Sequence, residues 1–270
     1  MLPPLQDTGG LIYMNKISKA FAGKKAFIGF VTAGDPDLET TKKVIEKMAD
    51  AGCTLVEIGI PFSDPVAEGP VIQNANVRAL KNNVTTDDVM QMAKELSQKI
   101  DIPMVFMTYL NVLFRYGYDR FLKNAKDSGI SGVIIPDLPF EEKEELQSVA
   151  VGYDMDVVSL IAPTSEDRIK MIASDAKGFL YCVSSLGVTG IRKDITTDLD
   201  SIVQTIKSVS DVPVAIGFGI NTPEQAKKYS QIADGVIVGS AIVKIIEQYG
   251  KDAPDRVYDY VKSMTDVMKS

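Results

Sequence analysis

The sequence predicts one α/β domain, a single (β/α)8 barrel of the TIM type. Eight short apolar segments read as continuous buried runs, which is the pattern of parallel strands covered on both faces. Helical segments separate them, and strand–helix alternation repeated eight times is typical of this barrel. The chain has 270 residues, close to the usual size of about 250 for such a domain, and no linker divides it. A doubly wound open sheet is the alternative that the same alternation allows.

The predicted strands are short and rich in Val and Ile, as strands usually are. Gly, Pro and Asp follow several of them and mark where the strands end. Only one strand carries a charged residue in its middle, Glu57. In chain order the expected strands are 26–33, 55–60, 104–108, 132–135, 156–161, 178–183, 212–216 and 235–238.

Several of the predicted helices begin at capping residues. Asp37 and Thr85 can accept hydrogen bonds from the free N–H groups of a first turn, and Ser240 is expected to do so for the apolar helix after the last strand. The helix from Glu141 is acidic in its first turn, which suits the helix dipole. The second strand is followed by two helices, one of them extra. In chain order the expected helices are 14–22 at the barrel floor, one after Asp37, 71–80, 85–100, 118–126, one from Glu141, one from about Ser165, one over 199–206, 221–229, one from Ser240, and 255–268.

Charge and hydropathy exclude two classes of partner. The formal charge of −7 and the pI near 4.8 argue against nucleic acid, because phosphate backbones need basic patches. No apolar run approaches the roughly 18 residues of a membrane span. Residues 1–13 have no basic segment and do not form a signal peptide. We expect them to be a disordered leader, either added to the protein or translated from an upstream start codon, and we expect the domain to span 14–270.

The counts of His and Cys limit which side chains can serve as catalytic groups or metal ligands. The chain has no histidine, which excludes Ser-His and Cys-His catalysis and any His-ligated metal. Cys53 and Cys182 lack metal-type spacing and lie in or beside apolar segments, so we expect buried free thiols in a reducing cytoplasm. Acid–base work must therefore fall to carboxylates, Lys, Tyr or Cys.

The stretch 55–70, LVEIGIPFSDPVAEGP, holds three carboxylates. Glu57 lies inside the apolar strand, whereas Asp64 and Glu68 lie in the rigid loop that follows. A carboxylate in such a strand is costly to bury unless it has a partner, a ligand or a raised pKa, which is the environment of an acid–base catalyst. The alternative is a Glu that faces solvent at a strand end.

Glycines follow the last strands and predict a phosphate site. Gly217-Phe218-Gly219 and Gly239-Ser240 would let backbone N–H groups approach a phosphate without clustered Arg or Lys. Barrels of this kind often bind phosphate near the seventh and eighth strands. Each glycine taken alone also fits an ordinary turn.

The stretch 55–70 closely resembles the second strand and loop of the tryptophan synthase alpha chain family, and the resemblance extends from about residue 14 to the end. It implies retro-aldol cleavage of indole-3-glycerol phosphate to indole and glyceraldehyde 3-phosphate. Glu57 matches the strand Glu of the family, and Asp64 matches the Asp of PFSDP. Glu68 departs from the most familiar pattern, in which Asp precedes the Gly-Pro.

The resemblance also implies roles for other residues. Glu57 would protonate indole C3 and take the side-chain hydroxyl proton, Glu68 would hydrogen-bond the indole N–H, and Asp64 would shape the loop and contact the partner. The matched phosphate-binding residues are Gly190, Phe218, Gly219, Gly239 and Ser240. The matched indole-pocket residues are Phe30, Ile72, Met107, Tyr181 and Phe218. The matched supporting residues are Tyr109, Asn111 and Asp137, with Thr189 in a mobile loop, SSLGVTG, that closes over the site.

The family further implies a partner, a beta chain that carries pyridoxal phosphate, in a linear αββα complex. No metal or organic cofactor is expected in this chain itself. Two alternatives stay open: another phosphosugar barrel isomerase or epimerase, and a non-catalytic alpha-like subunit that only activates its partner.

Overall fold

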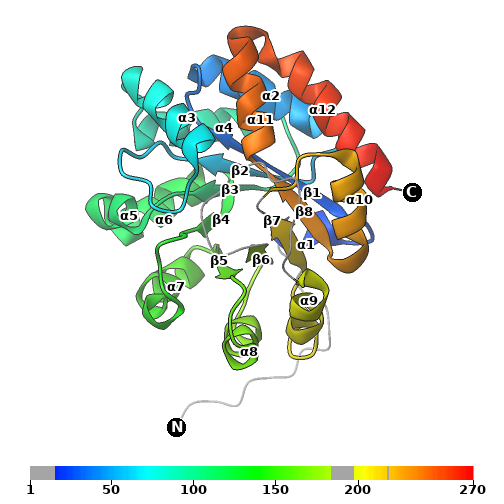
Figure 1. Ribbon diagram of the computed structural model, residues 1–270. Coiled ribbons are helices and arrows are strands. Elements are labelled where there is room, and N and C mark those ends of the chain that lie inside the picture. The colour runs from blue at the N-terminus through cyan, green and yellow to red at the C-terminus, as the bar shows by residue number, and fades with distance from the viewer. Residues whose placement is uncertain (1–15, 184–197, 218, 270) are drawn as a thin grey trace.

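The computed structural model describes residues 16–183, 198–217 and 219–269. Eight parallel strands close into a barrel in chain order, each hydrogen-bonded to the next and β8 to β1 (Figure 1). The helices form a ring outside the strands. The predicted (β/α)8 barrel is therefore confirmed, and the open sheet is excluded because its two edge strands would not pair.

The strands match the predicted ones to within a few residues at each end. They are β1 Ala26–Thr32, β2 Leu55–Gly59, β3 Met104–Met107, β4 Ile130–Ile134, β5 Asp156–Ile161, β6 Leu180–Val183, β7 Val214–Gly217 and β8 Gly235–Val238. The helices are α1 Lys16–Phe21, α2 Leu38–Asp50, α3 Pro70–Lys81, α4 Thr86–Leu96, α5 Leu110–Tyr116, α6 Tyr118–Asp127, α7 Glu144–Gly152, α8 Glu166–Ser174, α9 Leu199–Lys207, α10 Pro223–Ile232, α11 Ser240–Tyr249 and α12 Ala253–Met268, with single 3-10 turns at Phe140–Glu142 and Gly250–Asp252.

The strands divide their side chains between two apolar cores, because successive residues of a strand point to opposite faces. The outer core lies between the strands and the helices. The inner core fills the barrel, and in β2 it takes Leu55, so Glu57, two residues on, points the same way, into the barrel. The strand residues of the inner core are Ala26, Ile28, Phe30, Leu55, Val105, Met107, Ile134, Val158, Tyr181, Val183, Ala215 and Ile237.

Local capping explains most of the helix starts. Asp37 accepts from the backbone N–H of Thr40 at 2.7 Å, and Thr85 forms a reciprocal capping box with Asp88. Ser240 is not the N-cap that the sequence predicts. Gly239 occupies that position and Ser240 is the first helical residue, because α11 begins directly at the end of β8.

Two other segments differ from prediction. A single 3-10 turn comes first after Pro139, so α7 begins at Glu144 rather than at Glu141. The segment after β3, to which the sequence assigns no helix, forms α5. Its N-cap, Tyr109, makes no side-chain cap bond, and Asp137 from the loop after β4 accepts from the N–H of Leu110 at 2.9 Å.

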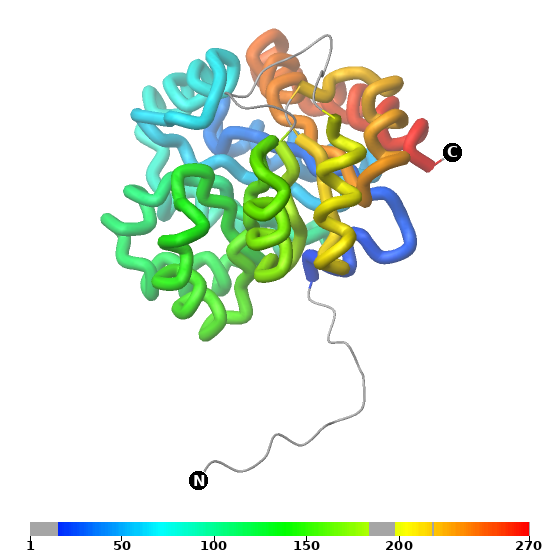
Figure 2. Tube along the Cα trace, turned by 60° about the horizontal axis from the view of Figure 1, so that its bottom comes forward, coloured from blue at the N-terminus to red at the C-terminus, as the bar shows by residue number. Residues whose placement is uncertain are grey.

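The end of the chain packs back onto its beginning. Helix α12 lies against α2, α10 and α11 and completes the outer ring (Figures 1 and 2). None of the helices in the described part of the chain has the length and hydropathy that a membrane crossing needs.

Candidate functional site

Glu57 is buried in the barrel, and no counter-charge from the described residues accompanies it. Its side chain is on the inner face of β2, the residue is 1% exposed, and neither carboxylate oxygen has a hydrogen-bond partner among the described residues. Burial raises the pKa of Glu57 to about 8. The group therefore carries a proton at neutral pH and can release it. A solvent-facing Glu at a strand end is excluded.

Two aromatic rings lie on the same inner face and are accommodated by glycines. Phe30 of β1 is the register partner of Glu57, and Tyr181 of β6 interacts electrostatically with the same carboxylate. A Cβ at Gly59 would lie 2.7 Å from Cζ of Phe30, and a Cβ at Gly217 would lie 2.5 Å from Cε1 of Tyr181. Since real Cβ atoms do not approach so closely, these glycines leave room for flat rings at the barrel mouth.

The other predicted indole-pocket residues lie in the same core. Met107 ends β3 on the inner face, and Ile72 packs into the inner core from the first turn of α3. Both are nearly fully buried. Phe218, the remaining predicted member, lies outside the described residues.

Glu68 is also buried, but it is held by hydrogen bonds. Its Oε2 accepts from Nδ2 of Asn76 at 2.6 Å, and the hydroxyl of Tyr109 contacts the same carboxylate. The Tyr109 hydroxyl also accepts from the N–H of Ala67 at 3.2 Å. Burial raises the pKa of Glu68 to about 7, against the opposing effect of the two hydrogen bonds.

The remaining supporting residues are distributed differently. Tyr109 stacks on Phe62 with ring centroids 5.2 Å apart, so the loop of Glu68 packs on the segment after β3. Asp64 is exposed, with its Oδ2 2.5 Å from the hydroxyl of Ser63. Asp137 caps α5, and Asn111 is exposed on that helix. The structure thus brings Tyr109 to Glu68, whereas Asp64 and Asn111 lie at the surface.

The predicted phosphate-binding residues that the structure describes follow strands β7 and β8. Gly219 has a φ of +95°, a conformation that favours glycine. Gly239 and Ser240 form the start of α11, where backbone N–H groups lack helical acceptors and the helix dipole favours an anion. Gly190 and Thr189 lie outside the described residues.

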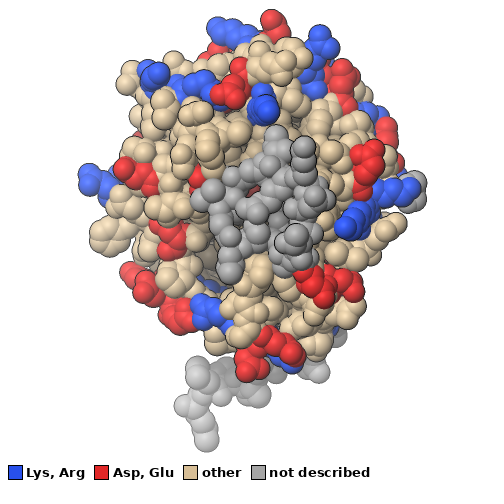
Figure 3. Space-filling view, in the orientation of Figure 1, with Lys and Arg blue, Asp and Glu red and all other residues tan. Residues whose placement is uncertain are grey.

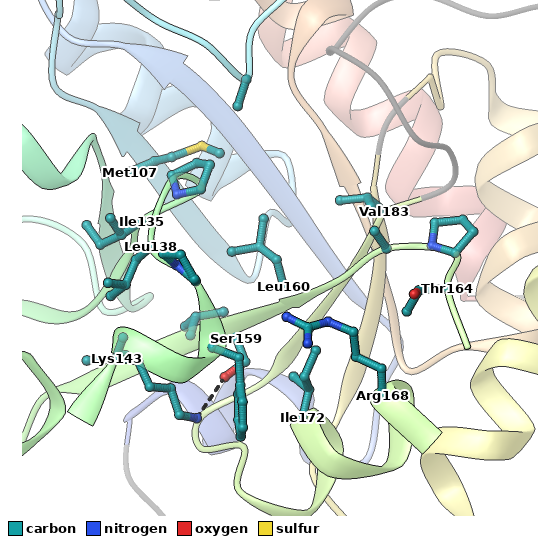
Figure 4. Close-up of a pocket in the computed structure, with 18 residues that line it drawn as sticks. Met107, Ile135, Leu138, Lys143, Ser159, Leu160, Thr164, Arg168, Ile172 and Val183 are labelled. Carbon is teal, nitrogen blue, oxygen red and sulfur yellow. Dashed lines mark hydrogen bonds between the residues drawn. The ribbon is translucent and has the colours of Figure 1, made fainter. Parts of the chain in front are cut away.

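A cavity of about 470 Å³ opens beside this mouth (Figure 4). At one end it is lined by Ala67, next to Glu68, and by Met107 and Val183. At the other end Lys143 points toward Ser159, and the two side chains are 3.5 Å apart. Its walls are largely apolar, but Glu57, Phe30 and Tyr181 are not among the residues that line it.

No group of three or more His, Cys, Asp or Glu side chains in the described ranges is placed to hold a metal ion. Cys53 and Cys182 are buried free thiols, and burial raises the pKa of each to about 12. Neither thiol is therefore poised as a nucleophile.

Three buried polar groups were not predicted from the sequence. Asn76 holds Glu68, and the hydroxyls of Thr32 and Thr108 are buried without a hydrogen-bond partner among the described residues. Asn76 could have been found, because it interrupts the apolar stripe of α3 formed by Ile72, Ala75 and Ala79. The two threonines end or follow strands and carry no comparable signal.

Comparisons with known proteins show the family to which the chain belongs. The family described as "Tryptophan synthase alpha chain" matches residues 17–269. The protein of that name from Thermoanaerobacter sp. (strain X514) is 46% identical over 262 residues, which cover 94% of this chain and all of that protein. The crystal structure of tryptophan synthase subunit alpha from Legionella pneumophila str. Paris superposes with a TM-score of 0.86 at 37% identity, covering 94% of this chain and 98% of that one.

A chain in the crystal structure of a tryptophan synthase complex from Pyrococcus furiosus also superposes, with a TM-score of 0.83 at 34% identity over 89% of this chain and 98% of that chain. Fold and sequence agree with those of the relatives over almost the whole described length. The chain therefore belongs to the tryptophan synthase alpha chain family.

Proposed function

We propose that Glu57 and Glu68 are the residues with which this chain carries out the reaction of its family, the retro-aldol cleavage of indole-3-glycerol phosphate. The observation that carries the proposal is the buried carboxyl of Glu57, which has no partner among the described residues and a pKa of about 8. Such a group is protonated before the reaction and is still able to release its proton near neutral pH.

Glu57 first acts as the acid. It donates its proton to indole C3, which turns the ring into a cationic tautomer and makes C3 a leaving group. The bond between C3 and the glycerol side chain then breaks, and its electron pair returns to the ring. The side-chain hydroxyl becomes the aldehyde of glyceraldehyde 3-phosphate, and its proton goes to the Glu57 carboxylate. The catalyst is regenerated, and the net change moves one proton from oxygen to carbon.

Glu68 stabilises the cationic tautomer. Its carboxylate accepts the indole N–H, which becomes more acidic when C3 is protonated, so the contact is stronger in the transition state than in the substrate. Hydrogen bonds from Asn76 and Tyr109 favour the ionised form that this role needs. Glu68 thereby takes the place of the Asp that is more familiar in the family.

The substrate lies across the barrel mouth. The indole ring lies beside Phe30, Tyr181 and Met107, and the phosphate is bound by N–H groups at Gly219, Gly239 and Ser240. Phe218, Gly190 and Thr189 are included in the proposal from the family resemblance alone. The carbon–carbon cleavage depends on proton transfers, which the side chains of this chain supply without a cofactor.

A beta chain binds at this face. Val66 in the loop of Glu68 and Phe114 on α5 are each 71% exposed, the highest exposure among the large apolar side chains of the described residues, and a partner would cover them. Asp64 is exposed beside Val66 and adds a charge for partner recognition. Positive and negative side chains are interspersed around the edge of the face in view (Figure 3).

Measuring indole release from indole-3-glycerol phosphate tests the proposal directly. We expect slow release by the chain alone, unaffected by a chelator and accelerated by a cognate beta chain. Glu68→Ala should lower kcat/KM by at least about 10-fold, with little change in thermal stability. Full activity of Glu68→Ala would exclude Glu68 and make Asp64 the next candidate.

The two alternative functions predict different results for ligand binding and for indole release. A phosphosugar isomerase or epimerase would not bind indole-propanol phosphate, because it needs no apolar slot for a ring. A non-catalytic subunit would bind it, release no indole and still activate the beta chain.

A further inference from the structure

Asn76 is a buried amide that contacts a carboxylate of the site. It lies in the second turn of α3, eight residues after Glu68, and is 4% exposed. Its Nδ2 donates to Oε2 of Glu68 at 2.6 Å, a short distance that fits a hydrogen bond to a charged acceptor. The other buried members of this helix, Ile72, Ala75 and Ala79, are apolar. Glu68 gives the amide its buried partner.

The backbone of Glu68 is fixed by the same helix. Nε2 of Gln73 donates to the main-chain oxygen of Glu68 at 2.8 Å, so α3 holds both ends of the residue. The contact with Asn76 depends on the length of the side chain, because a shorter Asp at position 68 would place its carboxylate about 1.5 Å further back. The extra methylene of Glu68 is therefore matched by the position of Asn76.

We infer that Asn76 is a positioning residue for the reaction: its amide fixes the carboxylate of Glu68 for the contact with the indole N–H. The inference rests on the role of Glu68 proposed above and adds the group through which that role is controlled. An amide neither ionises nor shuttles protons, so Asn76 acts only through Glu68. A carboxylate has about four acceptor positions, so the bond to Asn76 leaves positions for the substrate.

The same contact affects the charge of Glu68. Burial favours the neutral acid, whereas donation from Asn76 and Tyr109 favours the carboxylate. Asp137 is a further titratable group at this cluster, and its charge acts on the Tyr109 phenol. Removing Asn76 takes away one donor and leaves the burial, so the pKa of Glu68 rises. The acidic limb of the activity profile should then move to higher pH.

The experiment compares Asn76→Ala with Asn74→Ala in complex with the beta chain. Asn74 has the same residue type on the same helix but is exposed, so it controls for the change in helix propensity. We expect Asn76→Ala to lower kcat/KM by about 10- to 100-fold, as for the loss of a hydrogen bond to a charged group, and Asn74→Ala to change it less than 2-fold. The acidic limb should shift upward only in Asn76→Ala. The dissociation constant for indole-propanol phosphate should change by less than about 3-fold, because the loss falls mainly on the transition state.

Two further variants test whether Asn76 acts through Glu68. Asn76→Asp keeps the shape but sets two carboxyls about 2.6 Å apart, so it should shift the acidic limb further than Asn76→Ala does. In a Glu68→Ala background, Asn76→Ala should have less than a 2-fold effect, since its partner is gone. Circular dichroism and melting curves establish that each variant is folded.

If the unsubstituted chain releases indole, three results would each overturn this inference and leave the proposed function standing. They are a pH profile of Asn76→Ala that coincides with that of Asn74→Ala, an Asn76→Asp variant with wild-type activity, and an equal loss from Asn76→Ala with and without Glu68. No indole release by the unsubstituted complex would instead overturn the proposed function, and this inference with it.

Discussion

Two carboxylates that are each only 1% exposed belong to the neighbouring strands β1 and β2: Asp35 follows β1, and Glu57 lies within β2. The two carboxylates have opposite surroundings. Asp35, just after β1, accepts from Nε and Nη2 of Arg78 at 2.8 and 2.9 Å. Arg78 also bonds Glu247 on α11, so the loop, α3 and α11 are connected. Glu57, in β2, has no such partner among the described residues.

Burial alone therefore does not identify a catalytic carboxylate. A planar guanidinium donates to both oxygens of Asp35, which connects the loop to α3. The barrel interior offers Glu57 neither a charge nor a donor from the described residues, so its proton is retained and available. Of the two groups, Glu57 is suited to acid–base chemistry and Asp35 to holding loops together.

Replacing Glu57 by Gln should give the largest effect on function. The amide keeps the shape but cannot transfer a proton, so kcat for indole release should fall by about 10⁴-fold, at the upper end for a general acid–base residue. Binding of indole-propanol phosphate should stay within a few-fold of wild type. An unchanged kcat would remove Glu57 from the mechanism.

The same variant should change how stability depends on pH. The pKa of Glu57 is about 8 in the folded chain against 4.5 for an ordinary Glu, so the folded state retains a proton that the unfolded chain releases. Wild-type stability should therefore fall as pH rises from about 4.5 to 8. Glu57→Gln lacks this loss and should be more stable above pH 8 by an amount on the order of 5 kcal/mol, at 1.36 kcal/mol per pKa unit over the shift from 4.5 to about 8.

Chemical unfolding of both chains at pH 5 and pH 9 measures this difference. Glu68, with a pKa of about 7, contributes to both chains and cancels in the comparison. Parallel stability curves for the two chains would mean that Glu57 gains a charge partner in solution.

Breaking the Asp35–Arg78 ion pair should lower the stability of the fold rather than the rate of the reaction. Asp35→Asn leaves the Arg78 guanidinium with one acidic partner and an amide that cannot accept two N–H bonds. We expect a loss of about 3 kcal/mol, at the low end for a buried pair because Arg78 is 29% exposed and keeps Glu247. Urea unfolding measures the loss. In the folded variant kcat should change far less than in Glu57→Gln, and a reversed order would contradict the division of roles.

Most of the barrel could be predicted from the sequence because its signals are local. Apolar runs mark the strands, and Asp37 and Thr85 supply their own helix caps. The same holds for Glu57, since a lone charge in an apolar strand is visible without coordinates. Helix α5 could not be predicted, because its first N–H is bound by Asp137, 27 residues further along the chain.

The contact between Asn76 and Glu68 could not be predicted for the same reason. Glu68 and Tyr109 are expected from the family resemblance, but only the fold brings α3 to this carboxylate. The opposite holds for Asp64, which the sequence groups with the other two carboxylates of the loop region, whereas the structure leaves it at the surface. Sequence spacing shows which acids are close along the chain, but it does not show which are buried.

Asp64→Asn should therefore give the smallest effect and complete the series. The side chain is exposed and its described contact is with the neighbouring Ser63, so stability should change by less than about 0.5 kcal/mol. Activity of the isolated chain should stay within about 2-fold, because no buried group loses a partner. The change should appear only with the beta chain, as a several-fold weaker and less salt-dependent association, since an exposed interface charge acts mainly on encounter. Titration of the beta chain at two salt concentrations measures it. A large activity loss in the isolated chain would instead place Asp64 with Glu57, and the surface position of its carboxylate would then have to change when substrate binds.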